Sequence, residues 1–218
     1  MVPKDYPRVI IEAVKPQVDG GRFPIKRVVG EKVIVTADIY QEGHNKLAAL
    51  LKARKVGAKK WQETPMTLGD NDNWHGEFAV TSIGRWEYTI EAYTERYLSW
   101  VDEVTKKSVP GANLKSELLE GLAILKQSAV GAKGEACARI EGIIASMESA
   151  LASGDWHGAV DIGLGSEMRK LMATHPDRSE GYELAPALGI IVNRPITRFA
   201  AWYEFFPRSQ TSSPDRHG

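Results

Sequence analysis

The sequence predicts an α+β fold in which an antiparallel β-sandwich carries an inserted helical bundle. Before residue 100, short segments alternate apolar and polar residues, and clusters of turn residues separate them, as expected for strands joined by turns. From residue 100 to 178 the apolar residues recur every three or four positions, as they do on one face of a helix. Residues 188–193 then return to a β-branched run, so the helices are predicted to interrupt the sandwich.

The strands are predicted from alternation along short segments. In the stretch 84–100, Trp86, Tyr88 and Ile90 fall on one face, and the residues between them fall on the other. The segment 47–54 also fits a helix when read alone, but neighbouring strands of similar length favour a strand. Six or seven short strands with this turn spacing are typical of an immunoglobulin-like sandwich. The predicted strands cover residues 8–14, 32–40, 47–54, 59–64, 74–80, 84–92 and 188–193.

The helical bundle is predicted from capping signals and apolar repeats. Ser99 followed by Asp102 is a capping pattern that starts the first helix, and Asn113 is a candidate cap for the second. The last helix is predicted to end at His175, because the helical conformation is disfavoured for a residue that precedes a proline, here Pro176. The apolar repeats are Leu114, Leu118, Leu122 and Leu125, then Ile140, Ile144, Met147 and Leu151, then Trp156, Val160, Leu164, Met168 and Met172.

These patterns divide the chain into three parts. Residues 1–99 and 179–197 are predicted to form the sandwich, and residues 100–178 the inserted bundle. Residues 198–218 begin with an aromatic-rich segment, predicted as a strand over 198–209, and end in a polar stretch. We interpret this last part as the truncated start of a further domain.

Composition limits the classes of partner. The 28 basic residues balance 28 acidic ones, so no excess charge favours nucleic acid or an anionic membrane surface. No apolar run approaches the roughly 20 residues that span a bilayer, and the first residues lack the apolar centre of a signal peptide. Cys137 is the one cysteine, which excludes an internal disulfide. Together these features favour a soluble cytoplasmic protein.

Six stretches, taken together and in this order, carry a resemblance to a known family. They are RVIIEAVKPQVDGGRFPIKRVVGEKVIV (8–35), ADIYQEGH (37–44), NWHGEF (73–78), GRWEYTIEA (84–92), ELLEG (117–121) and RFAAWYEFFPRS (198–209). As a set they resemble the N-terminal region of the bacterial maltosyltransferases that elongate α-1,4-glucans from α-maltose 1-phosphate, which are members of the α-amylase superfamily. The resemblance is weak between about residues 126 and 192.

The resemblance implies a non-catalytic region that takes part in a homodimer and supports a (β/α)8 catalytic barrel, of which 203–209 looks like the first strand. Such a barrel needs about 250 residues, so the family's catalytic residues are expected outside this chain. Family members retain anomeric configuration through two carboxylates about 5–5.5 Å apart, and no Asp or Glu here matches either motif. We therefore expect no catalytic residue, cofactor site or metal site in these 218 residues.

Aromatic side chains are the candidate binding residues. Aromatic rings stack on sugar rings, so Trp61 and Tyr40 are candidate contacts for an α-glucan. Trp74 and Trp86 fall on the predicted core face and are expected to pack inside. The five histidines show no paired metal-ligand spacing. Two other functions stay open: a stand-alone immunoglobulin-like carbohydrate-binding module, and a purely structural assembly domain.

Overall fold

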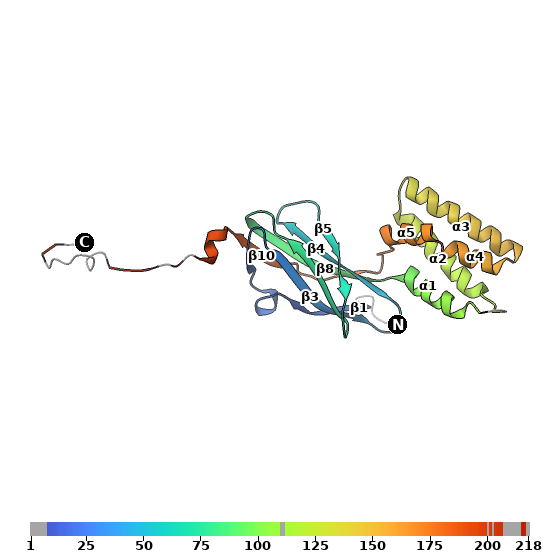
Figure 1. The fold of residues 1–218 in the computed structure, drawn as a ribbon, viewed down its shortest axis with the longest axis horizontal. Helices are drawn as coiled ribbons and strands as arrows, with labels where there is room; N and C mark the ends of the chain where they lie inside the picture. Colours follow the sequence, from blue (N-terminus) through green and yellow to red (C-terminus); the bar gives the residue numbers. More distant parts are fainter. Residues whose placement is uncertain (1–7, 110–111, 200, 202, 207–214, 217–218) are drawn as a thin grey trace.

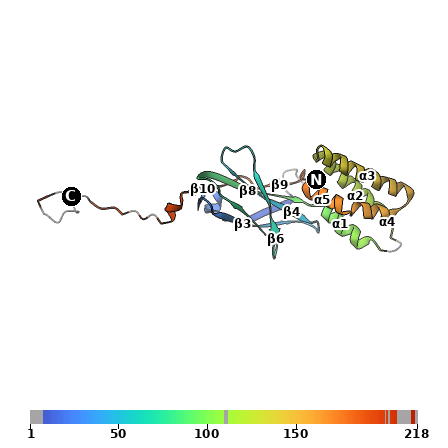
Figure 2. The ribbon, with the colours of Figure 1, turned by 45° about the horizontal axis from the view of Figure 1, so that its top comes forward.

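Two β-sheets and a group of α-helices make up the part of the chain that the computed structural model describes, namely residues 8–109, 112–199, 201, 203–206 and 215–216. The sheets lie together, and the helices gather at one end of them (Figure 1). The helices keep this position when the molecule is turned (Figure 2), so the two parts follow one another along its long axis. The structure is thus α+β, and its α-helices form one continuous block of the chain between two strands.

The first sheet has four strands, each antiparallel to its neighbours. Across the sheet they are β1 (Val9–Lys15), β3 (Lys32–Gln41), β7 (Asn73–Ala79) and β6 (Thr67–Leu68). Alternate residues of β3, from Val33 to Ile39, are fully buried, while the residues between them face outward. The period of two in the sequence therefore places one face of this sheet in the core.

The second sheet has six strands and contains a parallel pair. Across the sheet they are β2 (Ile25–Val28), β10 (Leu188–Asn193), β8 (Gly84–Thr94), β4 (Leu47–Lys55) and β5 (Gln62–Pro65), and β9 (Tyr182–Glu183) also pairs with β8. β2 and β10 are parallel, and the other pairs are antiparallel. The segment 47–54 is a strand, as predicted. β5 covers only the end of the strand predicted over 59–64. β2, β6 and β9 were not predicted, because elements of two to four residues give little alternation to recognise.

The core of the sandwich lies between the two sheets. Trp74 and Trp86 are buried there, which confirms the expectation that they pack inside. The rings of Phe78 and Tyr88 come from different sheets, and their centroids are 5.9 Å apart. Gly76 leaves room for Leu51 of the opposite sheet, whose Cδ2 would lie 3.3 Å from a Cβ placed at Gly76. The inner faces thus interdigitate, and only the outer faces are available for other contacts.

Five helices follow β8 and have an apolar core of their own. They are α1 (Arg96–Lys107), α2 (Lys115–Gly131), α3 (Glu135–Ser153), α4 (Trp156–Gly163) and α5 (Ser166–Thr174). The buried Trp100 of α1 organises this core: its Nε1 donates a hydrogen bond of 2.6 Å to the carbonyl oxygen of Glu117. Gly121 of α2 and Gly163 of α4 both lie against its ring. The lack of a Cβ at these two positions lets α2 and α4 pack closely on the indole of α1.

The capping prediction at Ser99 is wrong. The helix begins at Arg96, three residues earlier, and Glu95 caps it by accepting a hydrogen bond from the backbone N–H of Leu98. Ser99 lies inside the helix, where its hydroxyl donates to the carbonyl of Glu95 and accepts from the backbone N–H of Lys46. From the sequence alone, a serine whose hydroxyl hydrogen-bonds the residue before β4 cannot be distinguished from a serine that caps a helix. Asn113, one residue before the cap position of α2, accepts a hydrogen bond from the N–H of Lys115.

Two other predicted elements also differ in the structure. The single helix expected from Trp156 to Met172 is divided into α4 and α5 around Gly165, although the apolar repeat runs through the break. The strand predicted over 198–209 is wrong for its described residues: Arg198 ends the 3-10 turn η2 (Pro195–Arg198), and Tyr203 to Phe206 have no strand partner. Among its described residues, the aromatic side chains of Phe199, Tyr203, Phe205 and Phe206 are exposed. The remaining residues of that segment lie outside the described ones.

No helix in the described ranges has both the length and the apolar character that a bilayer crossing requires.

Candidate functional site

Tyr40 lies on the outer face of the four-stranded sheet. It is opposite Ile10 of β1, and its hydroxyl donates a hydrogen bond of 3.1 Å to Oε1 of Glu12. This hydrogen bond, with partial burial and the charges of Glu12 and Asp38, raises the pKa of Tyr40 above its usual value. The phenol therefore stays protonated at neutral pH, and its half-exposed ring stands beside two carboxylates.

The surroundings of Tyr40 form an open face, which we call the Tyr40 face; its residues are Ile10, Glu12, Ile34, Thr36, Asp38, Tyr40, Asn73 and His75. Nδ2 of Asn73 donates a hydrogen bond of 2.8 Å to Oδ1 of Asp38, and Ile34 is 63% exposed. An aromatic ring, carboxylates and an amide on one flat surface offer stacking and hydrogen bonds to a neutral, hydroxyl-rich ligand.

Trp61 lies just before β5 and contacts two cations of β4. The guanidinium carbon of Arg54 is 4.0 Å from the centre of its ring, and Nζ of Lys52 is 5.7 Å from it. Arg54 is held in turn by Glu87 of β8, with 2.6 Å between Nε and Oε1. Cation–π contacts of this kind stabilise an aromatic side chain at a surface. Part of the ring that was expected to stack on a sugar is therefore occupied by Arg54.

Lys52 is the centre of an ion-pair network on the outer face of the six-stranded sheet. The residue is only 8% exposed, and its Nζ lies 3.2 Å from Glu91 and 2.6 Å from Glu183. Arg178 extends the network, with Nη1 at 3.0 Å from Glu63 and 3.7 Å from Glu91. Burial lowers the pKa of Lys52, but the hydrogen bonds to Glu183 and Glu91 outweigh it and raise the pKa above its usual value. Lys52 therefore stays charged across the physiological range.

The structure does not bring Tyr40 and Trp61 together. Tyr40 points outward from the four-stranded sheet, and Trp61 packs on outward-facing residues of the six-stranded sheet. Since the inner faces of the two sheets share one core, these outer faces are on opposite sides of the sandwich. The two residues therefore cannot belong to one small binding site. Sequence reasoning missed the network around Lys52, because its partners come from segments up to 131 residues apart.

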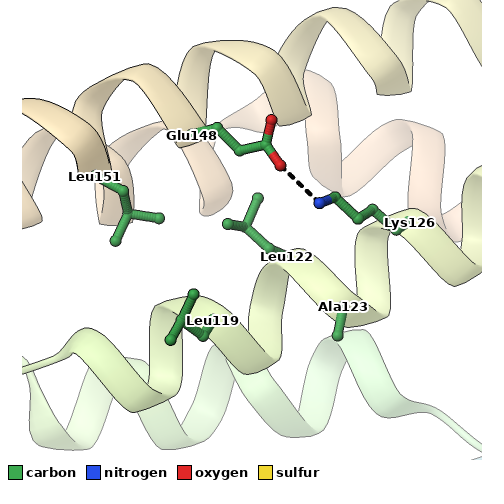
Figure 3. A pocket seen from close by; sticks show the side chains of 6 residues that line it. All are labelled: Leu119, Leu122, Ala123, Lys126, Glu148 and Leu151. Atoms are coloured by element: carbon green, nitrogen blue, oxygen red, sulfur yellow. Dashed lines mark ion pairs between the residues drawn. The ribbon is translucent and has the colours of Figure 1, made fainter.

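A third candidate surface lies between α2 and α3. A hollow of about 360 Å³ is lined by Leu119, Leu122, Ala123, Lys126, Glu148 and Leu151 (Figure 3). Nζ of Lys126 and Oε1 of Glu148 form an ion pair of 2.6 Å across it. The same two residues also line a second hollow of about 480 Å³, toward Val130 and Cys137. The surface is mainly apolar, since Leu119 and Val130 are both exposed.

The described residues include no group of three or more His, Cys, Asp or Glu side chains that are placed to hold a metal ion. Cys137 is half-buried in α3, with its Sγ near the carbonyl of Ala129 and the carboxylate of Glu141. Burial and the neighbouring Glu141 raise the pKa of the thiol, which keeps it in the unreactive, protonated form.

The family of the chain follows from comparison with known proteins. A family profile described as "Alpha-1,4-glucan:maltose-1-phosphate maltosyltransferase, domain N/S" matches residues 7–194. The chain belongs to this family. The resemblance that the sequence motifs carried is thereby confirmed, and the match spans both sheets and all five helices.

Curated relatives carry the same name, alpha-1,4-glucan:maltose-1-phosphate maltosyltransferase. The protein of Myxococcus xanthus is 41% identical over 208 residues, covering 92% of this chain and 31% of the relative. That of Rhodospirillum rubrum is 35% identical, covering 96% of this chain and 32% of the relative. That of Chlorobaculum tepidum is 32% identical, covering 97% of this chain and 31% of the relative. The chain thus spans about a third of the length of these relatives.

Proposed function

We propose that this chain is the non-catalytic N-terminal portion of a maltosyltransferase that elongates α-1,4-glucans with α-maltose 1-phosphate as donor. The match to the family's domain N/S over residues 7–194 carries the proposal. In the whole enzyme, one carboxylate attacks the anomeric carbon while a second carboxyl group gives its proton to the leaving phosphate. A hydroxyl of the acceptor glucan then displaces the first carboxylate and returns a proton to the second. We place both carboxylates on a barrel that this chain supports, and the reaction in the cytoplasm.

The assay for this function compares the 218-residue chain with a whole enzyme that contains it. We expect the whole enzyme to release phosphate from α-maltose 1-phosphate when an acceptor glucan is present. The 218 residues alone should release none above the buffer rate. Turnover by the short chain that survives repurification would contradict the non-catalytic role. Failure of the whole enzyme to use this donor would contradict the proposed reaction.

The sandwich is, in this proposal, of the immunoglobulin-like type. Two facing sheets with mostly antiparallel neighbours and a shared core support it, as does the spacing of the short strands. The parallel pair of β2 and β10 departs from a purely antiparallel sandwich. Superposition of an experimental structure on immunoglobulin-like domains tests this assignment, and a strand order that matches none of them would reject it.

We also propose that the helices contribute to a homodimer of the whole enzyme. The apolar hollow between α2 and α3, with the exposed Leu119 and Val130, supports this role. Light scattering on the whole enzyme should give the mass of a dimer. Val130→Asp should shift the mass toward the monomer, because a charge would be buried at the contact. Ile34→Asp on the Tyr40 face should leave it unchanged, and a strictly monomeric parent would reject the dimer.

The alternative function is a stand-alone carbohydrate-binding module. The Tyr40 face favours it, because this surface combines a half-exposed ring with exposed carboxylate and amide groups, which are paired with one another as Tyr40–Glu12 and Asn73–Asp38. Trp61 is the weaker candidate, since Arg54 already stacks on its ring. In an affinity gel that contains soluble starch, Tyr40→Ala should abolish any retardation of the chain, whereas Trp61→Ala should preserve it. A parent chain that migrates equally with and without starch would reject this alternative.

A further inference from the structure

The chain passes between the sandwich and the helices twice, at neighbouring points of the same sheet. We call these two connections the crossings. The chain leaves β8 at Thr94 and enters α1 at Arg96. It returns from α5 through residues 175–181 and pairs again with β8 as β9. Direct contacts between the helices and the strands are few: Ser99 accepts a hydrogen bond of 2.8 Å from the N–H of Lys46, whose Nζ lies 3.9 Å from Asp102. The orientation of the helices therefore depends on how these crossings are held.

The return segment, which we define as residues 178–184, is fixed to the six-stranded sheet by backbone and side-chain hydrogen bonds. The N–H of Leu184 donates to the carbonyl of Ile90 over 2.9 Å. Oγ1 of Thr89 donates to the carbonyl of Leu184 over 2.7 Å. Thr89 is fully buried as a result, although it lies on the outward face of β8. The end of the return segment is thus part of the sheet.

Ion pairs attach the rest of the return segment. Lys52 binds Glu183, and Arg178 binds Glu63 of β5, so two strands of the sandwich hold residues at both ends of the segment. Both cations also contact Glu91, which therefore joins the two pairs. Because Lys52 is almost fully buried, its charge depends on these carboxylates for compensation.

The middle of the return segment reaches the outgoing crossing. Glu180 accepts from Arg96, the first residue of α1, with 2.6 Å between Oε2 and Nη2. The same carboxylate oxygen lies 3.5 Å from Nη1 of Arg8, just before β1. One segment therefore contacts the outgoing crossing, the first strand, and the strands β4, β5 and β8.

We propose that the return segment and its ion pairs form a joint that fixes the orientation of the helices relative to the sandwich, with Lys52 and Arg178 as its positioning residues. The backbone ladder holds Glu183 in place, and the two cations hold the turn that follows α5. Without the cations, the chain from Arg178 to Gly181 keeps its local hydrogen bonds and the ion pairs of Glu180. Of these contacts, only the exposed one of 3.5 Å between Glu180 and Arg8 reaches the sandwich. The helices are then free to swing about the two crossings while each core stays folded.

Pulsed electron–electron spin resonance measures this orientation directly. In a Cys137→Ala background, Ile34→Cys places one spin label on the Tyr40 face and Ser149→Cys places the other on the exposed side of α3. The parent should give a single narrow distance distribution. The double variant Lys52→Met, Arg178→Met should broaden it at least twofold, while the circular dichroism spectrum stays that of the parent.

A matched control separates the joint from any general loss of charge. Lys32→Met removes a well-exposed ion pair with Glu77 on the other sheet, and should leave the distribution unchanged. Glu183→Gln provides a milder variant, in case the double variant does not fold, and should broaden the distribution as well. A folded double variant, or a folded Glu183→Gln chain, whose distribution is as narrow as the parent's would overturn the proposal. Equal broadening by Lys32→Met would do the same.

Discussion

At the scale of single residues, the contact between Gly121 and Trp100 is a tight constraint in the core of the helices. A Cβ at position 121 would lie 2.5 Å from Cζ2 and 2.7 Å from Nε1 of the buried indole. The indole cannot move away, because its Nε1 is bonded to the carbonyl of Glu117 and Gly163 lies against another part of the ring. The glycine is therefore required by packing, since its position in a helix would otherwise favour alanine.

We predict that Gly121→Ala destabilises the chain by about 1–3 kcal/mol, as overpacking does in other cores. Gly142→Ala in α3 is the matched control, because a Cβ there meets nothing within 4 Å. The control should stabilise the chain by about 0.5–1 kcal/mol through helix propensity alone. Urea denaturation followed by circular dichroism measures both values. If Gly121→Ala matched Gly142→Ala, the close contact with Trp100 would be disproved.

Glu95 is a buried carboxyl at the start of α1, and its ionisation should oppose folding. Burial raises its pKa above the usual 4.5, and the charge of Asp177 adds to the shift. Hydrogen bonds from the backbone N–H groups of Leu98 and Tyr97 oppose the shift without cancelling it. Between the unfolded and folded pKa values, the folded chain holds a proton that the unfolded chain has lost. This contribution to stability is therefore present below the unfolded pKa and is lost as pH rises through the folded pKa.

We predict that Glu95→Gln gains stability relative to the parent as pH rises from about 4 to 7, because glutamine cannot ionise. The free energy of unfolding, measured in urea at several pH values, gives the difference between the two chains. A carbon-13 NMR titration of the Glu95 carboxyl should give a pKa above 4.5. Glu120→Gln, on the exposed side of α2, serves as the control. A difference that falls with rising pH would contradict the sign of the predicted effect.

At the scale of elements, Asp155 separates α3 from α4 by capping the second of these helices. Its Oδ1 accepts a hydrogen bond of 2.9 Å from the backbone N–H of Gly158. Gly154, with a φ of 79°, ends α3 directly before it in the left-handed conformation. The two residues together reverse the chain within a very short connection.

We predict that Asp155→Ala costs about 1 kcal/mol, the usual loss for a helix cap, and that Asp155→Asn costs much less because its amide oxygen can still accept. Asp161→Ala, on the exposed side of the same helix, controls for the loss of one negative charge. Thermal unfolding followed at 222 nm ranks the three variants. An Asp161→Ala chain as unstable as Asp155→Ala would assign the effect to charge instead of capping.

Elements were predictable where a local pattern was long enough to specify them. The strands β3 and β8 have ten or more residues, and their alternation predicted both the strand and its inward face. The segment of β4 also fitted a helix, and the neighbouring strands decided that prediction. β2 and β9 were missed because they are short and are formed by pairing with β10 and β8, which the local sequence does not encode. The candidate site was less predictable still. Only the three-dimensional fold places Tyr40 and Trp61 on opposite sides and gathers distant charges around Lys52.

At the scale of the whole molecule, the two parts have separate cores. The sandwich core holds residues from both sheets, whereas the helical core holds residues from 97 to 172. The contacts that join the parts are mainly ion pairs and hydrogen bonds at their surfaces. Interfaces of this kind contribute little to folding compared with buried apolar surface. Each part is therefore expected to retain its fold without the other.

The positions of the two crossings make this independence testable. Ala92 of β8 is directly opposite Tyr182 of β9, so the chain leaves and re-enters the sheet at adjacent points. Replacing residues 96–177 with a short Gly-Ser linker would join β8 and β9 as an ordinary hairpin, while Arg178 is kept. Loop closure across a few residues costs little entropy compared with the burial of the sandwich core. We predict that the shortened chain is monomeric, has the circular dichroism of a β protein and unfolds cooperatively on heating. A chain without cooperative unfolding would mean that the helices are needed to fold the sheets, and the separation of the two cores would not extend to their stability.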